Sequence, residues 1–263
     1  MFDDATVRAA AKVAARLNVE PAALLAVAEV ESAGKAFARV NGKNEPLIRF
    51  EGHYFDRRLT PEQRKKARAE GLSSPTAGAV KNPTKQEDRW KLLNRAIAIN
   101  STAALESVSW GLGQVMGSHW KALGYGSVTE MVNECRSSVA GQIEAMARFI
   151  EKNDLAGHLR RKDWAKFARA YNGPGYKQNA YDTKMARAYA KWAKADAPKA
   201  PAAPVEPPKP ATPIPVPPEP TITPTPPAGR AKGIWALIIA ALLGAWLWIA
   251  TRPCEWLGLF CGG

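Results

Sequence analysis

A run of 19 residues without a charged side chain, Gly233–Thr251, is the feature that most restricts how this chain folds. As a helix it would be roughly 28 Å long at about 1.5 Å per residue, close to the hydrocarbon thickness of a bilayer, about 30 Å. Tryptophans crowd this end of the chain, as interfacial aromatic residues do: Trp235, Trp246, Trp248 and Trp256. We therefore predict one C-terminal transmembrane helix over 231–252 and a short tail over 253–263. A buried helix of a soluble domain is the alternative.

The segment before this run is rich in proline, since residues 196–230 hold 14 of the 21 prolines. Proline lacks a backbone N–H, and chains rich in it favour extended polyproline II, at about 3.1 Å per residue. We predict that 196–230 is a semi-rigid linker between the membrane helix and a folded domain over 1–195. A docking motif for a proline-recognising partner is the alternative.

The two ends of the chain suggest a membrane topology. The first residues, Met1–Asp4, are acidic, and an amphipathic segment follows them, so no secretion signal is expected. Arg230 and Lys232 precede the apolar run and Arg252 follows it. By the positive-inside rule, the N-terminal domain is expected on the cytoplasmic side.

Residues 1–195 carry 32 Lys and Arg against 20 Asp and Glu, a net charge of +12. Such a surface favours a polyanionic partner: nucleic acid, anionic lipid or an acidic cell-wall polymer. The three histidines lack metal-ligand spacing, and Cys135 is the one cysteine of this part of the sequence. No metal site is therefore expected.

Helical signals dominate 1–195, which predicts a mainly α fold with one small β-hairpin. A cap at Asp3 or Asp4 predicts a helix ending at Asn18, and Pro21 and Gly34 bound the next. The hairpin is predicted where Asn41-Gly42 separates 37–40 from 47–50. Further helices are expected over 61–70, 84–99, 127–134, 138–152, 162–171 and 177–194.

Glu31 is the first candidate for chemistry, because it lies at the end of an apolar helix, just before Gly34. Partial burial and the negative end of the helix dipole both raise the pKa of a carboxyl. Such an acid can donate a proton near neutral pH. A solvated charge at a helix end is the alternative.

Two further segments have unusual composition. Ser109–Gly117 reads SWGLGQVMG, and its glycines do not follow Gly-x-Gly-x-x-Gly, nor is a strand predicted before them, so a dinucleotide site is excluded. Dense glycine beside Gln114 favours backbone that lines a cleft. The second segment, Ala170–Tyr176, reads AYNGPGY and predicts a helix end followed by a tight turn.

Taken in order, three blocks resemble the lysozyme superfamily: Glu31-Ser32 with Phe37, Gly111-Leu112 with Gln114 and Met116, and Tyr171-Asn172-Gly173. The phage-type N-acetylmuramidases of endolysins are the more similar family, because Pro46–Phe55, Asp163-Trp164 and Tyr181-Asp182 also fit their pattern. The resemblance covers residues 2–194 and implies an α+β, lysozyme-like fold.

It also implies cleavage of the β-1,4 bond between N-acetylmuramic acid and N-acetylglucosamine in peptidoglycan, without a cofactor and without nucleic acid as a partner. Glu31 matches the catalytic acid. Gln114, Tyr171 and Asn172 match cleft-lining positions, and with Ser109 they form the expected substrate-binding set. About seventy residues separate Glu31 from Gly111, more than in lytic transglycosylases.

Glycosidases normally use two carboxyls, and Glu51 in that insert is the candidate second one, or else an organiser of the cleft. A helix N-terminal residue is a third interpretation of Glu51. If Glu51 is not catalytic, the N-acetyl group or a transglycosylase-like cyclisation takes the second role. A lytic transglycosylase and a non-enzymatic wall-binding module are therefore the alternative functions.

Together these features predict a phage or prophage endolysin held in the bacterial inner membrane by a single C-terminal helix and acting on periplasmic peptidoglycan. The predicted topology leaves the domain away from the wall. A pore-forming partner of the holin type, collapse of the membrane potential, or delivery within a virion would each resolve this.

Overall fold

The first two helices begin and end where the sequence predicts them. Helix α1 (Asp4–Leu17) follows Asp3, whose side chain accepts a hydrogen bond from the Thr6 amide at 2.9 Å, and it ends at the left-handed Asn18. Helix α2 (Pro21–Ser32) starts with proline and ends at Ala33 and Gly34, both with positive φ. Residues 22–28 of α2 are all buried, so this helix lies inside the fold rather than on its surface.

The computed structural model describes residues 2–195, which are mainly helical as predicted. The helices after α2 are α3 (Gly52–Arg58), α4 (Pro61–Ala69), α5 (Gln86–Ile97), α6 (Ser101–Glu106), α7 (Val128–Ser137), α8 (Val139–Lys152), α9 (Ala156–Arg160), α10 (Trp164–Asn172) and α11 (Tyr181–Lys194), with short 3-10 helices η1 (Gly117–His119) and η2 (Pro174–Lys177).

The β structure differs from the prediction in two ways. Strand β1 (Phe37–Val40) pairs across Asn41-Gly42 with β2 (Lys43–Pro46), so the prediction that 47–50 is its partner is wrong. Instead β3 (Ile48–Phe50) starts a second sheet with β4 (Val108–Trp110) and β5 (Val115–Met116), all antiparallel. The prediction that no strand precedes the glycine-rich segment is therefore wrong, because β4 leads into it. The glycines of the segment still do not follow Gly-x-Gly-x-x-Gly.

Strand β3 has one neighbouring strand, and two side-chain amides take the place of a second. Asn82 accepts from the Phe50 amide at 2.9 Å and donates to the Phe50 carbonyl at 2.7 Å. Gln86 does the same for Ile48, at 2.9 and 3.3 Å. Backbone groups at the edge of a buried sheet need partners, so these amides complete β3.

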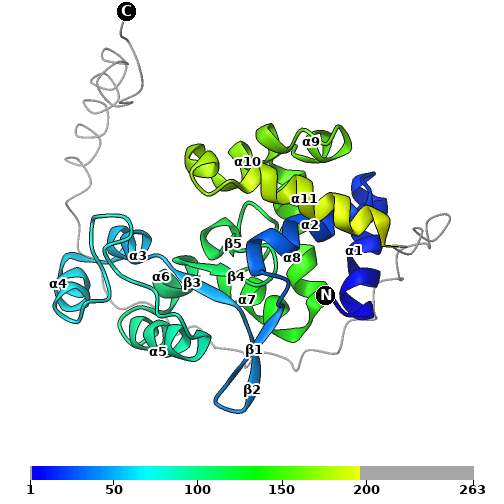
Figure 1. Cartoon of the computed structure of the whole chain (residues 1–263). Helices are drawn as coiled ribbons and strands as arrows, with labels where there is room; N and C mark the ends of the chain where they lie inside the picture. The colour runs from blue at the N-terminus through cyan, green and yellow to red at the C-terminus, as the bar shows by residue number, and fades with distance from the viewer. Residues whose placement is uncertain (1, 196–263) are drawn as a thin grey trace, which may run out of the picture. The chain divides into compact units, whose positions relative to one another are not determined.

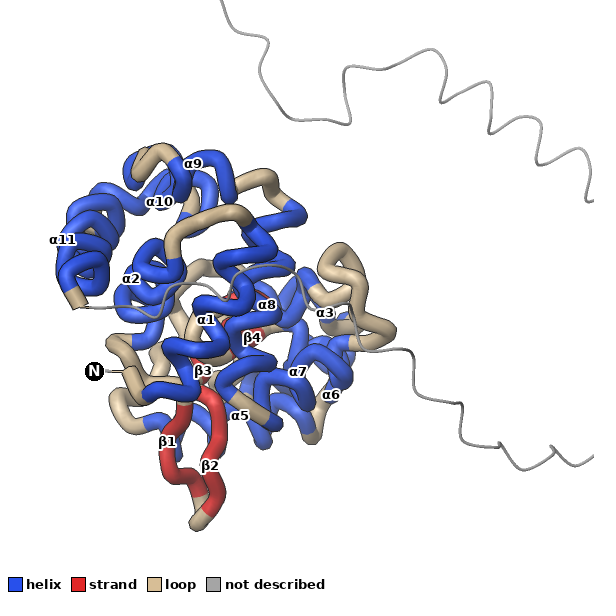
Figure 2. Tube along the Cα trace, turned by 90° about the vertical axis from the view of Figure 1, so that its right-hand side faces the viewer, coloured by secondary structure: helices blue, strands red, loops and turns tan. Residues whose placement is uncertain are grey.

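The three-stranded sheet lies between two groups of helices (Figure 1): α3–α6 on one side, and α2, α10 and α11 with α1 and α8 on the other. The β1–β2 hairpin projects from this body in both views (Figures 1 and 2). One face of the sheet is apolar and fully buried, through Ile48, Phe50, Val108 and Trp110, and Trp110 meets Trp90 of α5 edge to face.

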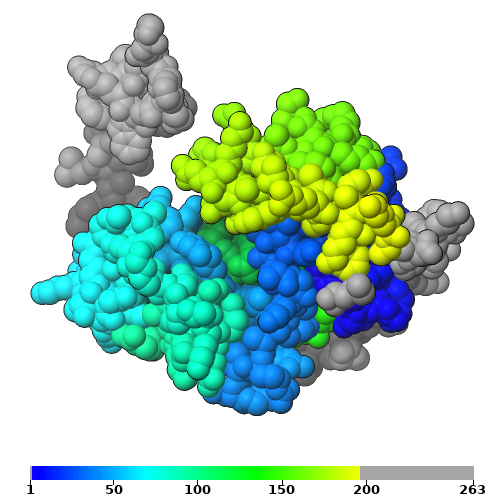
Figure 3. Space-filling view, viewed as in Figure 1, coloured from blue at the N-terminus to red at the C-terminus, as the bar shows by residue number. Residues whose placement is uncertain are grey.

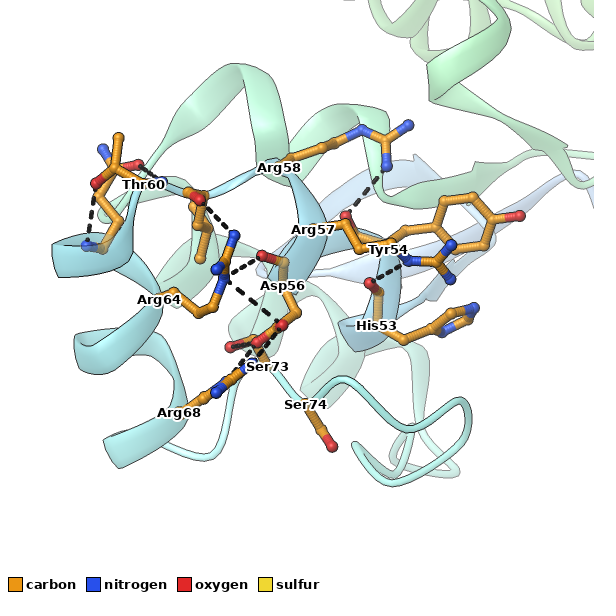
Figure 4. Close-up of polar contacts among 12 residues, drawn as sticks. His53, Tyr54, Asp56, Arg57, Arg58, Thr60, Arg64, Arg68, Ser73 and Ser74 are labelled. Atoms are coloured by element: carbon orange, nitrogen blue, oxygen red, sulfur yellow. Dashed lines mark hydrogen bonds and ion pairs between the residues drawn. The ribbon is translucent and has the colours of Figure 1, made fainter. Parts of the chain in front are cut away.

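Helices α3 and α4 are joined by a buried carboxylate. Asp56 accepts two hydrogen bonds from Arg68, both at 2.7 Å, and one from the Ser73 hydroxyl at 3.0 Å (Figure 4). These donors hold the pKa of Asp56 below its usual value. Arg64 of α4 also lies 3.7 Å from Asp56, so both arginines of α4 have a structural role.

The predicted linker (196–230), transmembrane helix (231–252) and tail (253–263) lie outside the described residues. Within residues 2–195, none of the helices combines the length and the apolar character needed to cross a membrane.

Candidate active site

Glu31 lies in the last turn of α2 and is mostly enclosed by neighbouring helices. Burial raises the pKa of its carboxyl to about 7, in the direction that the sequence predicts. One hydrogen bond opposes this effect, because the Asn172 side chain donates to Glu31 Oε1 at 2.6 Å and so favours the charged form. At neutral pH the carboxyl is therefore close to half protonated, as a general acid should be.

The end of α10 supplies the residues around this carboxyl. Tyr171 is stacked on Phe167, meets Phe149 edge to face, and donates from its hydroxyl to the Gly113 carbonyl at 2.7 Å. Gly173, with φ of 83°, then ends the helix directly after Asn172. Asn172 Oδ1 is buried and has no hydrogen-bond partner among the described residues, so one acceptor beside Glu31 is unused.

The glycine-rich segment runs from β4 through a turn into β5 and packs tightly on α8. A Cβ on Gly113 would lie 2.6 Å from the Met146 Cβ and 3.0 Å from the Tyr171 hydroxyl. Gly111 has φ of 63° and a similar clash with Gln142. The glycines therefore allow α8 to approach, which adds a packing reason to the predicted cleft-lining role.

Two predicted substrate-binding side chains have protein partners in this segment. Gln114 has φ of 47° and donates from Nε2 to the Gly111 carbonyl at 2.8 Å, which braces its own turn. Ser109 is buried and donates to the Met116 sulfur at 3.2 Å. Contact with a substrate remains a prediction for all four residues. Of the other two, Asn172 bonds to Glu31, and the negative charge of Glu31 acts on the Tyr171 phenol.

The second face of the three-stranded sheet is polar. Residues paired directly across antiparallel strands share a face, and here Arg49 pairs with Ser109, which pairs with Met116. Glu51 follows on the same side, with its Oε1 2.7 Å from Arg49 Nε and its Oε2 3.5 Å from His53 Nδ1. Glu51 directly follows β3 and directly precedes α3. The sequence prediction that it lies after a strand and the interpretation that it lies at a helix start therefore both agree with the structure.

A groove separates the two groups of helices on this face of the molecule. Figure 3 shows it between the cyan surface of α3–α5 and the yellow-green surface of α10–α11, with green atoms at its floor. Asn172 ends α10 and Glu51 precedes α3, and these two helices belong to the groups on opposite sides of the groove. The groove thus has the form expected for binding a polymer along its length.

Comparison with known proteins agrees with this geometry. A model of the N-acetylmuramidase family matches residues 20–193. The chain belongs to this family. Among solved structures, the Burkholderia AP3 phage endolysin is similar, with a TM-score of 0.63 and 37% identity over 74% of each chain. None of the curated proteins compared with the chain matches it.

The resemblance inferred from the sequence blocks is thereby confirmed, and peptidoglycan is the substrate class of this muramidase. The family match spans Glu31, Glu51 and the end of α10.

Two residues of the muramidase cleft were not predicted. Tyr181, at the start of α11, has a raised pKa because of burial first and of the negative charge of Glu31 second, and the positive charge of Arg49 opposes both. The Tyr181 phenol is therefore within reach of the charges of both Glu31 and Arg49. The Tyr181-Asp182 pair carried part of the resemblance and was the one available signal.

His119 also belongs to the surroundings of this site, through aromatic contacts. Its ring meets Phe149 edge to face at 5.1 Å, and Phe149 meets Tyr171 at the same distance. Burial, with the nearby charge of Arg58, lowers the pKa of His119, so it is neutral at pH 7. Among residues 2–195, no three His, Cys, Asp or Glu side chains gather as metal ligands.

Proposed function

We propose that this muramidase hydrolyses the β-1,4 bond between N-acetylmuramic acid and N-acetylglucosamine, with Glu31 as the general acid. The observation that carries the proposal is the buried Glu31 carboxyl, whose pKa is about 7 and whose Oε1 is held by Asn172 at 2.6 Å. A protonated carboxyl fixed in a groove can donate to the glycosidic oxygen as the C–O bond breaks.

Glu51 is our candidate for the second role. As a carboxylate across the groove it would stabilise the positive charge that develops on the sugar or take a proton from the attacking water. The hydrogen bond from Arg49 Nε, at 2.7 Å, holds the side chain in place. Water then adds to the sugar carbon. Its released proton passes to Glu31 directly, or to Glu51 when Glu51 is the base, in which case Glu31 is reprotonated from solvent.

The products of peptidoglycan digestion test this proposal. The purified chain is incubated with purified peptidoglycan, and mass spectrometry identifies the new glycan ends. Hydrolysis predicts reducing N-acetylmuramic acid. Ends with 1,6-anhydro-muramic acid would instead indicate a lytic transglycosylase and would remove water and Glu51 from the mechanism. Binding without cleavage, by correctly folded protein, would favour the wall-binding module.

We also propose that the chain acts in lysis of a bacterial host. The similarity to the AP3 phage endolysin supports this role. Expression in a bacterium, with the membrane permeabilised chemically to replace a holin-type partner, should cause lysis within one culture cycle. The Glu31→Gln variant at equal expression is the control, and lysis by that variant would contradict the role.

Anchoring by residues 231–252 remains a proposal that rests on the uncharged run of the sequence. Membrane fractionation tests it directly. The full chain should sediment with inner membranes and resist extraction by high salt, while a chain without 231–252 should not. Equal recovery of both chains in the soluble fraction would contradict the anchor.

A further inference from the structure

Two arginines, Arg49 of β3 and Arg89 of α5, lie against the same strand, and one acidic residue, Glu51, pairs with Arg49. Arg49 extends from β3 on the groove side, and its side chain is 55% exposed. Its Nε bonds to Glu51, whose side chain is 19% exposed, and no other ion pair of Arg49 occurs within residues 2–195. The outer part of the Arg49 guanidinium is thus available at the groove surface.

A second guanidinium lies beside the first. Arg89, in the first turns of α5, donates from Nε to the Pro83 carbonyl at 2.7 Å and from Nη1 to the Ile48 carbonyl at 2.9 Å. Ile48 directly precedes Arg49, so these bonds fix Arg89 against the same stretch of β3. Burial and the positive charge of Arg49 both lower the pKa of Arg89.

Arg89 has no acidic partner in the part of the chain that the structure describes. Its helical neighbours Glu87 and Asp88 both contact Lys91, at 3.7 and 3.0 Å. Glu51 is therefore the single carboxylate that pairs with this arginine pair. Arg89 is bonded to the carbonyl of Ile48, the residue before Arg49, so both guanidiniums lie at the same stretch of β3 and can offer charged N–H donors to a second carboxylate.

We propose that Arg49 and Arg89 form a carboxylate-binding subsite, called here the arginine subsite, which recognises the acidic groups of peptidoglycan. This inference rests on the proposed muramidase function and names the chemical group that the groove binds in addition to the sugar rings. The ligand is a carboxylate on the muramic acid side of the glycan. It has two sources: the lactyl group of muramic acid when no peptide is attached, or the peptide stem when one is.

Chitin has the same β-1,4-linked N-acetylated sugars but no carboxylate, so it fits the groove without using the arginine subsite. This difference separates recognition of acid from recognition of sugar. The position of the subsite agrees with such a role, because Arg49 is near enough to Tyr181 to affect its pKa, and Tyr181 is also near Glu31.

Binding measured with the full chain in the Glu31→Gln background tests the proposal without cleavage. Calorimetry gives the Kd for three soluble glycans of equal length: strands with peptide stems, strands stripped of peptides by an amidase, and chitin oligosaccharides. Arg49→Gln with Arg89→Gln should weaken binding of an acidic glycan roughly tenfold or more, because the charged hydrogen bonds to the carboxylate are lost. Chitin binding should change less than about twofold.

The pattern of losses identifies the source of the carboxylate. A loss confined to stem-bearing strands assigns the subsite to the peptide, and a loss confined to stripped strands assigns it to the lactyl group. Unchanged affinity for both acidic glycans would overturn the proposal. Equal weakening for all three glycans would also overturn it, because the arginines would then have a structural role in the groove and would not bind a carboxylate.

Two further variants keep the result interpretable. Arg49→Gln alone changes an exposed side chain and should fold even if the Arg89 replacement disturbs β3. Arg95→Gln, on the same helix α5 but paired with Glu70, is the matched control and should leave all three Kd values unchanged. If wild-type chain cleaves nothing yet the arginine variants lose acidic glycans selectively, the proposed hydrolysis fails while the arginine subsite stands.

Discussion

At Glu31, burial and one hydrogen bond act on the pKa of the carboxyl in opposite directions. Burial favours the protonated form and raises the pKa to about 7, whereas the hydrogen bond from Asn172 favours the carboxylate. The Asn172 side chain therefore limits how far the pKa of Glu31 rises. This balance suits a residue that must donate a proton in one step and recover it in another.

Replacing Asn172 should shift the pH dependence of catalysis. A general acid works only while protonated, so activity falls as the pH rises through the pKa of Glu31. Asn172→Ala removes a donor to the charged form, and the alkaline limb of the kcat/KM profile should move to higher pH. The profile on peptidoglycan measures this. Asn179→Ala, at an exposed position before α11, is the control, and an unmoved or lowered limb in Asn172→Ala would contradict the account.

Glu31 should also reduce stability at neutral pH. Its pKa is about 7 in the folded chain, against an ordinary 4.5, so the folded state binds the proton more tightly. The destabilisation by the Glu31 carboxyl is absent below about pH 4.5, grows as the pH rises from there through about 7, and then amounts to about 3 kcal/mol. Glu31→Gln should therefore raise the Tm at pH 8 more than at pH 4. An equal change at both pH values, by thermal unfolding, would argue against burial as the cause.

Among the elements, β3 depends most on contacts that are distant in sequence. It has only three residues, one paired strand, and the amides of Asn82 and Gln86 at its other edge. Because β3 presents Arg49 and leads into Glu51, these amides also position one wall of the groove. The strand is a structural support for the site and not only a part of the core.

Asn82→Ala should weaken this support. It leaves the Phe50 N–H and carbonyl without their side-chain partners in a region away from water, which costs about 1–3 kcal/mol in the free energy of unfolding. Denaturant unfolding measures the loss, and Asn133→Ala, at an exposed position of α7, should change stability by less than about 0.5 kcal/mol. Equal effects of the two replacements would show that the edge of β3 does not need the amide.

The sequence predicts the elements whose signals are local. Caps and prolines placed α1, α2 and α4 almost to the residue, and the position of Glu31 before Gly34 identified the buried acid. Strands β4 and β5 have three and two residues, too few to show alternation, so they were missed. Arg49 and Tyr181 are over one hundred positions apart in the sequence, and their proximity follows from packing that no local pattern contains.

At the scale of the whole molecule, the net positive charge is concentrated in residues 1–195. Residues 1–195 carry 32 basic and 20 acidic side chains. Positive charge of this extent attracts a polyanionic wall over long range, and the attraction falls with salt. The sugar contacts inside the groove depend much less on ionic strength.

Salt should therefore separate wall binding from sugar binding. Raising NaCl from about 10 to about 150 mM shortens the Debye length from about 30 to about 8 Å, and the Glu31→Gln chain should sediment less completely with isolated peptidoglycan. Its Kd for chitin oligosaccharides should stay nearly constant over the same range. A salt-independent association with peptidoglycan would contradict a role for the net charge.

The most direct test of the central claim is the rate of peptidoglycan cleavage by Glu31→Gln beside wild type, at equal concentration and near pH 6. Glutamine keeps the size of the side chain but holds no proton that it can donate. Loss of a general acid lowers rates by about 10²–10⁴, so the account predicts a decrease of at least a hundredfold in a variant that is folded and still binds glycan. Cleavage within a few-fold of wild type would contradict it and remove Glu31 from the mechanism.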